Sequence, residues 1–256
     1  RLLTLPARDA TMDEIARVHD RAYVEVVRET SERGGGGFDA DTYLNVHSYA
    51  AAVRAVGGVL AAVEAVVAGR DRTALCLVRP PGHHATPERG MGFCLFNNVA
   101  IAARFIRKRV LIVDWDVHHG NGTQDTFADD PSVFYLSTHR FPFYPGTGHA
   151  EERGAGNLLN VPFVGSVSRK QIQKKFAAPL RKAVPDFKPE FVLVSCGFDA
   201  YARDPIGGLG LEPEDYRTMT DVVREPGVPV VSALEGGYSL EGLGPCAEQH
   251  VLGLLA

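Results

Sequence analysis

The sequence has no long uninterrupted apolar run, since no stretch approaches the about 18 residues that would span a membrane. No basic region followed by an apolar core, as in a secretory signal peptide, lies near the N-terminus. The four cysteines are far apart and show no Cys-x-x-Cys spacing, so neither a zinc knuckle nor a disulfide scaffold is expected. These absences predict a cytoplasmic protein without a membrane partner.

An excess of charge of either sign is also lacking. Lysine and arginine number 27 against 31 acidic residues, which gives a net charge of −4, and no basic run is present. We therefore expect no direct nucleic-acid partner and a mild preference for a cationic substrate. At 256 residues, 45% of them hydrophobic, the chain fits one large domain. Because it starts at Arg1 without a methionine, we expect that an N-terminal segment is missing.

What the sequence does contain is a dense polar cluster in residues 110–122, which read VLIVDWDVHHGNG. The apolar start predicts a buried strand. In extended backbone, side chains alternate between faces, so Asp114, Asp116 and His118 share one side and His119 takes the other. Acids and histidines at the end of an apolar strand are costly without a cation, so this stretch predicts a cation site.

Further apolar segments predict strands at 73–79, 133–138, 191–196 and 229–234. Helical patterns cover 49–67, 98–106 and 172–184, and a capping box at Thr11 predicts a first helix that continues to Val26. Continuous apolar strands alternating with helices predict a three-layer α/β/α fold with a mainly parallel sheet. The interval from Tyr216 to Pro229 is short for a crossover helix plus turn, so we expect residues to be absent there.

In such folds ligands bind at the carboxyl ends of the strands. Three residues at these ends, Asp116, His118 and Asp199, offer two carboxylates and an imidazole to a divalent ion. Zn²⁺, Fe²⁺ and Co²⁺ all accept such ligands. A water on an ion with two carboxylate ligands is less acidic than in an all-histidine site, so a nearby base is needed.

Either His83 or His84 can be that base, provided that the Pro-Pro-Gly bend at 80–82 places both on a loop. Asp114 can accept a hydrogen bond from the second ring nitrogen of one histidine and raise its basicity. At another strand end, Tyr238 follows Gly236 and Gly237. Its phenol is either an oxyanion donor or a packing group, and spacing alone favours neither.

The remaining histidines are expected to be structural. Isolation from acidic residues predicts packing roles for His19, His47 and His250, and a surface or supporting role is favoured for His139 and His149.

Several segments together resemble the zinc-dependent histone deacetylase family, most closely its class II branch and bacterial relatives. They occur in the family's order and are RPPGHHA at 79–85, GMGFCLFNN at 90–98, DWDVHHGNG at 114–122, YPGTG at 144–148, GFDA at 197–200 and EGGY at 235–238. The resemblance implies a single deacetylase domain over residues 1–256 with an arginase-like fold. It also implies one catalytic zinc and hydrolysis of an acetyl amide on lysine, in a peptide or protein, or on a polyamine.

The resemblance also implies roles for individual residues. It assigns zinc ligation to Asp116, His118 and Asp199, acid/base chemistry to His83 and His84, the oxyanion donor to Tyr238 and the partner of His83 to Asp114. Asn121 stands where many class I members have an aspartate next to His84, so the charge partner of that histidine differs here. A structural potassium ion would be held by Asp114, Asp116 and His118, with contacts from Ser137 and Thr138. The acyl-lysine channel would lie between Phe93 and Tyr144, beside Gly92, Gly236 and Gly237.

Three other functions compete with this interpretation. An acetylpolyamine amidohydrolase shares the catalytic motifs. An arginase-like enzyme would need more metal-binding acids for two manganese ions. A non-catalytic module that binds acyl-lysine is disfavoured, because the expected ligands, both histidines and the tyrosine are all present. The oligomeric state stays open.

Overall fold

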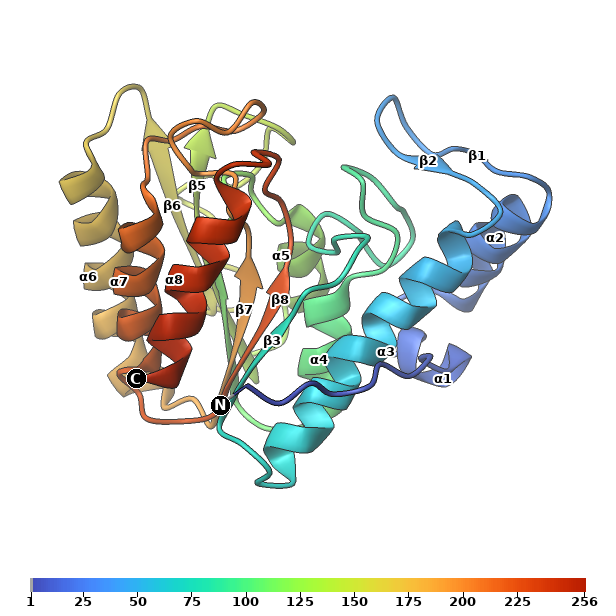
Figure 1. Ribbon diagram of the computed structural model, residues 1–256, viewed down its shortest axis with the longest axis horizontal. Coiled ribbons are helices and arrows are strands. Elements are labelled where there is room, and N and C mark those ends of the chain that lie inside the picture. The colour runs from blue at the N-terminus through green and yellow to red at the C-terminus, as the bar shows by residue number, and fades with distance from the viewer. Residues whose placement is uncertain (1) are drawn as a thin grey trace.

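The central feature is a six-stranded, all-parallel sheet in the order β3-β8-β7-β4-β5-β6, seen in a computed structural model that describes residues 2–256 (Figure 1). Its strands are β3 Thr73–Cys76, β4 Val110–Asp114, β5 Val133–Phe141, β6 Leu158–Val164, β7 Phe191–Cys196 and β8 Val230–Leu234. A separate short antiparallel pair joins β1 Gly36–Gly37 to β2 Tyr43–Leu44. The predicted mainly parallel α/β sheet is confirmed.

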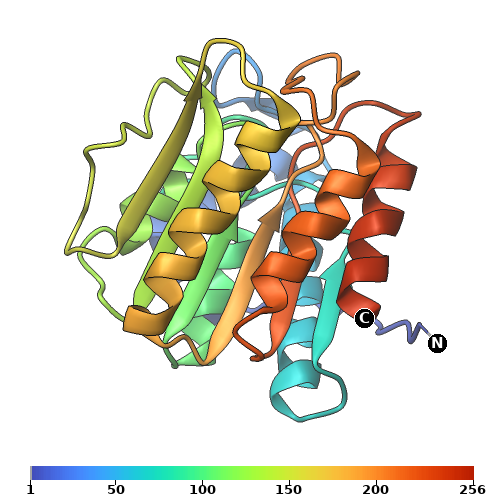
Figure 2. The ribbon, with the colours of Figure 1, turned by 90° about the vertical axis from the view of Figure 1, so that its left-hand side faces the viewer.

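Helices cover both faces of the sheet and complete the three layers (Figures 1 and 2). One face carries α6 Arg169–Phe187, α7 Pro213–Arg224 and α8 Leu243–Leu255. The other carries α3 Ser48–Val67, α4 Asn98–Ile106 and α5 Asn121–Phe127, with α1 Met12–Ile15 and α2 Arg21–Glu32 outermost. The loops that follow the strands gather at the top of Figure 1.

The central strand β4 feeds two hydrophobic cores, one on each side of the sheet. Val110 and Ile112 pack into the core beneath α3 and α4, whereas Leu111 and Val113 pack into the core beneath α6, α7 and α8. The alternation continues beyond the strand, where Trp115 also enters the second core. The chain after β4 is therefore held in place by burial, which fixes the polar side chains that alternate with these apolar ones.

The predicted first helix is wrong in its extent. The capping box at Thr11 is present, because Thr11 Oγ1 accepts from the Glu14 amide at 3.2 Å and the Glu14 carboxylate accepts from the Thr11 amide at 2.8 Å. The helix nevertheless ends at Ile15. Tertiary contacts break it, since the Asn97 amide donates to His19 Nε2 at 2.8 Å.

The crossover between β7 and β8 also differs from expectation. The helix α7 begins at Pro213, three residues before Tyr216, and ends at Arg224, so the crossover is completed without additional residues. The helix fits because it begins before Tyr216, and the expectation that residues are absent there stays a prediction. The strand β6 and the helices α5 and α8 were not predicted.

The helix α3 is long and apolar enough to cross a membrane by length and composition alone, and within residues 2–256 it is the one helix that is. Arg54 and Glu64 interrupt it, and 56% of its most apolar window is buried inside the fold. A Cβ atom on Gly57 would lie 2.0 Å from the Arg8 carbonyl oxygen, so the glycine permits close approach of the N-terminal segment. These contacts make α3 a core helix, as expected.

Candidate active site

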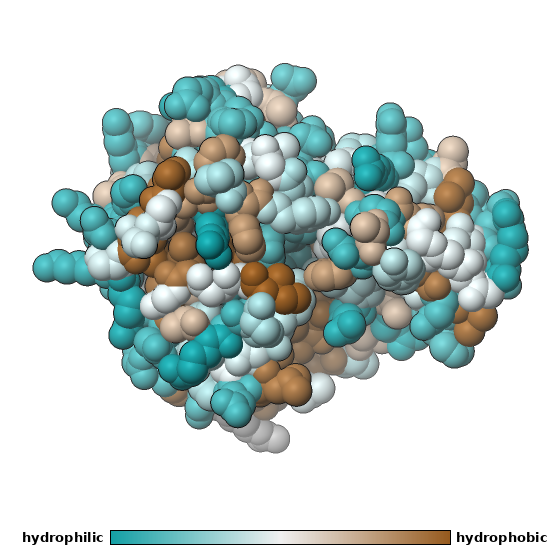
Figure 3. All heavy atoms as spheres, turned by 90° about the horizontal axis from the view of Figure 1, so that it is seen from above, coloured by the Kyte–Doolittle hydropathy of each residue, from teal (hydrophilic) through white to brown (hydrophobic). Residues whose placement is uncertain are grey.

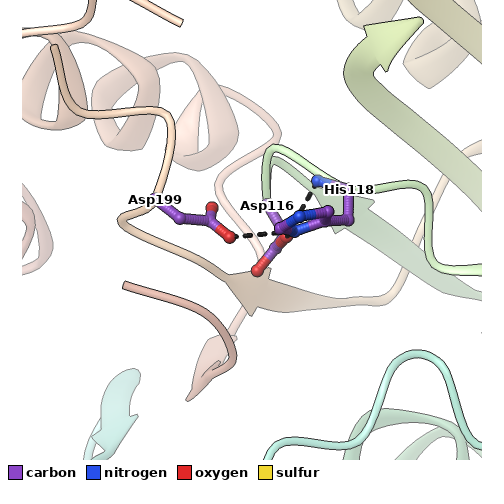
Figure 4. Close-up of side chains that lie close together, drawn as sticks. All are labelled: Asp116, His118 and Asp199. Carbon is purple, nitrogen blue, oxygen red and sulfur yellow. Dashed lines mark hydrogen bonds and ion pairs between the residues drawn. The ribbon is translucent and has the colours of Figure 1, made fainter. Parts of the chain in front are cut away.

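The loops after β4 and β7 bring together Asp116, His118 and Asp199, three buried residues whose ligand atoms all lie within 4.8 Å of one another (Figure 4). The Nδ1 of His118 lies 3.0 Å from Asp116 Oδ1 and 3.1 Å from Asp199 Oδ2. The opposite oxygens are held by backbone amides, because Gly236 donates to Asp116 Oδ2 and Val117 donates to Asp199 Oδ1, each at 2.8 Å. The carboxylates are thus oriented toward one point.

The close approach of two carboxylates and one imidazole shifts the pKa values of Asp199 and His118. Burial and the neighbouring charge of Asp116 raise the pKa of Asp199 to about 7. Although burial disfavours its charged form, hydrogen bonds to both carboxylates raise the pKa of His118 to about 10. Two carboxylates and one imidazole in this geometry fit a divalent ion with positions left open for other ligands. We therefore regard these residues as able to hold the metal that the sequence predicts.

His83 lies beside this group and faces a buried carboxylate. Its Nδ1 is 3.0 Å from Asp114 Oδ2, which also accepts from the Tyr135 hydroxyl at 2.9 Å. Its Nε2 lies 3.8 Å from Asp116 Oδ1. Although burial opposes it, the charges of Asp114 and Asp116 hold the pKa of His83 well above its usual value. Asp114 therefore lies where the sequence places the partner of this histidine.

His84 packs against His83, with ring centroids 4.0 Å apart, but faces a neutral partner. Its Nδ1 is 2.9 Å from Asn121 Oδ1, and Asn121 Nδ2 points to the His84 carbonyl at 3.4 Å. An amide oxygen only accepts, so the proton sits on Nδ1 and leaves the Nε2 lone pair free. Burial and the charge of His83 hold the pKa of His84 well below its usual value.

A buried glutamate fixes the loop that carries both histidines. Glu235 Oε2 accepts from the amides of Gly82 at 2.6 Å and His83 at 3.1 Å, and its Oε1 accepts from Ser195 Oγ at 3.1 Å. Burial raises the pKa of Glu235 to about 7. The bend at residues 80–82 thus places His83 and His84 on a loop. This is the condition under which both histidines can reach the site.

The expected channel residues gather above the histidines. Gly92 and Phe93 form a tight turn in which both have positive φ, 56° and 69°. A Cβ atom on Gly92 would lie 2.5 Å from His84 and 3.0 Å from Tyr144, so only glycine fits. Phe93 packs edge-on against Tyr238, with ring centroids 6.0 Å apart, and remains 41% exposed. This turn presents an aromatic wall to solvent.

The same face is seen from above in Figure 3, where apolar and hydrophilic side chains are interspersed. Tyr144 lies across from His84, with ring centroids 5.1 Å apart, and is 37% exposed. Below the turn, a Cβ atom on Gly236 would lie 2.3 Å from Asp199 Oδ2. Gly237 has a φ of +136°, and Tyr238 follows it. Burial and the charges of Asp116 and Asp199 raise the pKa of Tyr238, so the phenol keeps its proton.

The remaining predicted residues lie around the site or away from it. Ser137 is fully buried and pairs with Asp114 in the β4–β5 register, and Thr138 follows it. His139 is buried and bonds to Ser137 Oγ and the Gly148 carbonyl, each at 2.9 Å. His250 is buried, with its ring nitrogens bonded to Ser232 and Thr220, and it is not one of the grouped ligand residues. His19, His47 and His149 likewise lie outside the ligand group.

Several residues that contact this site have no role predicted from the sequence. Tyr135 donates to Asp114, the partner of His83, and Glu235 accepts from the backbone amides of Gly82 and His83. Phe143 stacks on His118 with ring centroids 5.1 Å apart and planes 14° apart. The sequence marks Glu235 as a candidate, because it directly follows the strand β8. No sequence feature marks Tyr135, since it lies inside an apolar strand and reaches Asp114 only through the pairing of β4 with β5.

The known proteins that resemble this chain are deacetylases. A family model described as "Histone deacetylase domain" matches residues 1–254. Histone deacetylase 15 of Arabidopsis thaliana is 41% identical over 100% of this chain, which spans 49% of that relative. A probable deacetylase of Methanothermobacter thermautotrophicus is 39% identical over 92% of this chain and 74% of its own length. The crystal structure of the HDA15 HD domain has a TM-score of 0.94 and 41% identity, and covers 98% of this chain and 74% of that one.

Proposed function

Because the chain belongs to the histone deacetylase family, we propose that it is a metal-dependent amidohydrolase that removes the acetyl group from the ε-amine of lysine in proteins or peptides. One observation carries the proposal. The metal-ligand group of Asp116, His118 and Asp199 meets a pair of histidines that differ in their partners. The family alone does not distinguish lysine from polyamine substrates, so the substrate is part of the proposal.

Asp116, His118 and Asp199 would hold the metal, with Zn²⁺ as the proposed ion. When bound, such an ion polarises the acyl carbonyl and lowers the pKa of a water molecule. The amides of Gly236 and Val117 keep the two carboxylates aimed at this position. Because these hydrogen bonds already exist without the metal, Asp116 and Asp199 would need little rearrangement when it binds.

His84 is the proposed proton acceptor. Its Nε2 lone pair is free because Asn121 fixes the proton on Nδ1. The Nε2 would take a proton from the attacking water and then donate it to the leaving amine. His83, paired with Asp114, would stay protonated and stabilise the negative charge that develops on the acyl group.

Tyr238 is the proposed donor to the oxyanion. Its pKa is raised, so its hydroxyl remains a hydrogen-bond donor at neutral pH. The alkyl chain of the lysine would lie between Phe93 and Tyr144, above the narrow floor that Gly92 permits. In this arrangement the amide would lie at the histidines, and the rest of the substrate would lie outside the channel.

We further propose a structural potassium ion next to the catalytic group. The ligands would come from Asp114, Asp116 and His118, partly through backbone oxygens, with Ser137 and Thr138. The register that pairs Ser137 with Asp114, and the complete burial of both residues, support this position. The ion would support the loop after β4 and take no part in the reaction.

The experiment that tests the proposal compares substrates directly. Acetylated lysine peptides and acetylated polyamines are assayed side by side, each with and without a chelator. We expect the peptides to be hydrolysed faster, and the chelator to stop the reaction. Faster turnover of the polyamines would change the substrate to that class, and no turnover of either with metal bound would overturn the proposed activity.

A further inference from the structure

Asp204 connects two loops of the site, although it does not come directly after a strand. It is 9% exposed and sits in the segment after β7, five residues beyond Asp199. Its carboxylate joins this segment to the loop after β8, which carries Tyr238. The residue belongs to no motif that the sequence singled out.

Both carboxylate oxygens of Asp204 are used, each by a pair of backbone amides. Oδ1 accepts from Ile206 and Gly207, at 2.9 Å each, which closes the loop on its own side. Oδ2 accepts from Tyr238 at 2.7 Å and Ser239 at 3.2 Å. A charged acceptor makes stronger hydrogen bonds than a neutral one, so these bonds fix the backbone at Tyr238.

The residue two positions before Tyr238, Gly236, is bonded to the metal-ligand group. The Gly236 amide donates to Asp116 Oδ2 at 2.8 Å, and the Gly236 carbonyl accepts from the Phe198 amide at 2.8 Å. Between these anchors and Tyr238 stands only Gly237, at a φ of +136°. Glycine permits many backbone conformations. Without Asp204, the tyrosine would therefore follow a flexible link, and its packing against Phe93 would hold it less precisely.

We propose that Asp204 is a positioning residue that sets the location of the Tyr238 hydroxyl for the reaction. This inference rests on the proposed hydrolysis and on the donor role of Tyr238. Displacing a catalytic group by about 1 Å can reduce the rate by about 100-fold, so the anchor matters although it touches no substrate. We assign its effect to Tyr238. Because the Gly208 amide also donates to the Asp199 carbonyl, at 2.8 Å, metal content must be measured to separate this effect from one on the metal ligands.

A double-mutant cycle tests the proposal. Asp204→Asn keeps the size of the side chain but replaces one acceptor with an amide donor, which opposes the backbone N–H groups. We expect this substitution to lower kcat by about tenfold or more in the natural protein, with KM changed by less than about twofold and metal content unchanged. In a Tyr238→Phe background the same substitution should change kcat by less than about twofold, because the hydroxyl that it positions is gone.

The matched control is Asp130→Asn. Asp130 also accepts a backbone amide, that of Ser132 at 2.9 Å, but it precedes β5 and so lies near the amino end of that strand, whereas the site lies at the carboxyl ends. The Asp130→Asn substitution should leave kcat unchanged. An equal loss from Asp204→Asn in both backgrounds would overturn the proposal, since the effect would then not depend on the hydroxyl.

A second measurement uses the natural protein and does not depend on the folding of a variant. Amide hydrogen exchange should show strong protection at Tyr238 and Ser239, and rapid exchange at both would overturn the anchor. The two hypotheses fail separately. If the natural protein hydrolyses no acyl-lysine, the proposed function fails, whereas full activity of Asp204→Asn on a hydrolysed substrate rejects only the positioning role.

Discussion

His84 turns its Nδ1 toward Oδ1 of Asn121 at 2.9 Å, whereas the adjacent His83 turns its Nδ1 toward the carboxylate of Asp114 at 3.0 Å. Two neighbouring imidazoles in one buried loop therefore have partners of different charge. A carboxylate stabilises an imidazolium and an amide oxygen does so much less. The two histidines consequently differ in protonation, and the pair supplies both a neutral and a charged ring.

Replacing Asn121 with aspartate should shift the pH dependence. A carboxylate beside His84 favours its protonated form and raises its pKa, which is now held well below its usual value. Since the base must be unprotonated, the acidic limb of the kcat/KM profile should move to higher pH. The control is Asn45→Asp, which adds the same charge at an exposed loop. An unchanged acidic limb would show that His84 is not the base.

Metal binding should release protons. At a pH between the pKa of Asp199, about 7, and that of His118, about 10, the metal-free imidazole is charged and must lose its proton to become a ligand. Below about 7, protonation of Asp199 adds a second proton to be released, so affinity should fall more steeply there. Calorimetric titration in buffers of different protonation enthalpy counts these protons. Binding without proton release in the upper range would contradict the charged His118.

Replacing Tyr238 with phenylalanine removes only the proposed oxyanion donor. We expect kcat to fall by about 100- to 1,000-fold, as for other oxyanion donors, while KM stays similar. Metal analysis should give the same content as in the natural protein, because the tyrosine is not a ligand. Normal turnover in this variant would remove Tyr238 from the mechanism.

Phe93 adopts a φ of 69°, a backbone conformation that favours glycine and asparagine over phenylalanine. A substitution there can therefore relieve backbone strain and remove the aromatic ring at the same time, which separates stability from function. Phe93→Asn should keep the unfolding free energy or raise it by about 1 kcal/mol, and should lower kcat/KM by about tenfold through loss of the aromatic wall. Arg107→Asn relieves the same conformation at the end of α4, away from the site, and should leave kcat/KM unchanged. Full activity of Phe93→Asn would exclude an aromatic wall at this position.

The sheet and the metal-ligand group could be predicted because both follow from a simple rule. Apolar runs form parallel strands, and polar residues that directly follow them meet at one edge. Asp116 and Asp199 are brought together in this way from strand ends far apart in sequence. The strand β6 was missed because Asn160 and Pro162 interrupt its apolar pattern and because an edge strand tolerates such residues.

Asp114 was predicted as the partner of His83, but other contacts that support the site could not be predicted, because they depend on tertiary structure. Asp204 lies in an irregular loop, and its bonds to Tyr238 arise only when the segments after β7 and β8 pack together. The hydroxyl of Tyr135 reaches Asp114 through strand register. The first helix breaks after Ile15 because His19 is bound by a distant amide. No local pattern encodes these partners.

The most direct test of the proposed activity is metal removal and return on an acetyl-lysine peptide, with acetate and free amine both measured. We expect chelation to reduce the rate to background and a single equivalent of Zn²⁺ to restore it, with equal amounts of acetate and amine. The Asp199→Asn variant lacks one proposed ligand, so one equivalent of Zn²⁺ should not restore its hydrolysis rate. Undiminished hydrolysis by the metal-free protein would contradict the account.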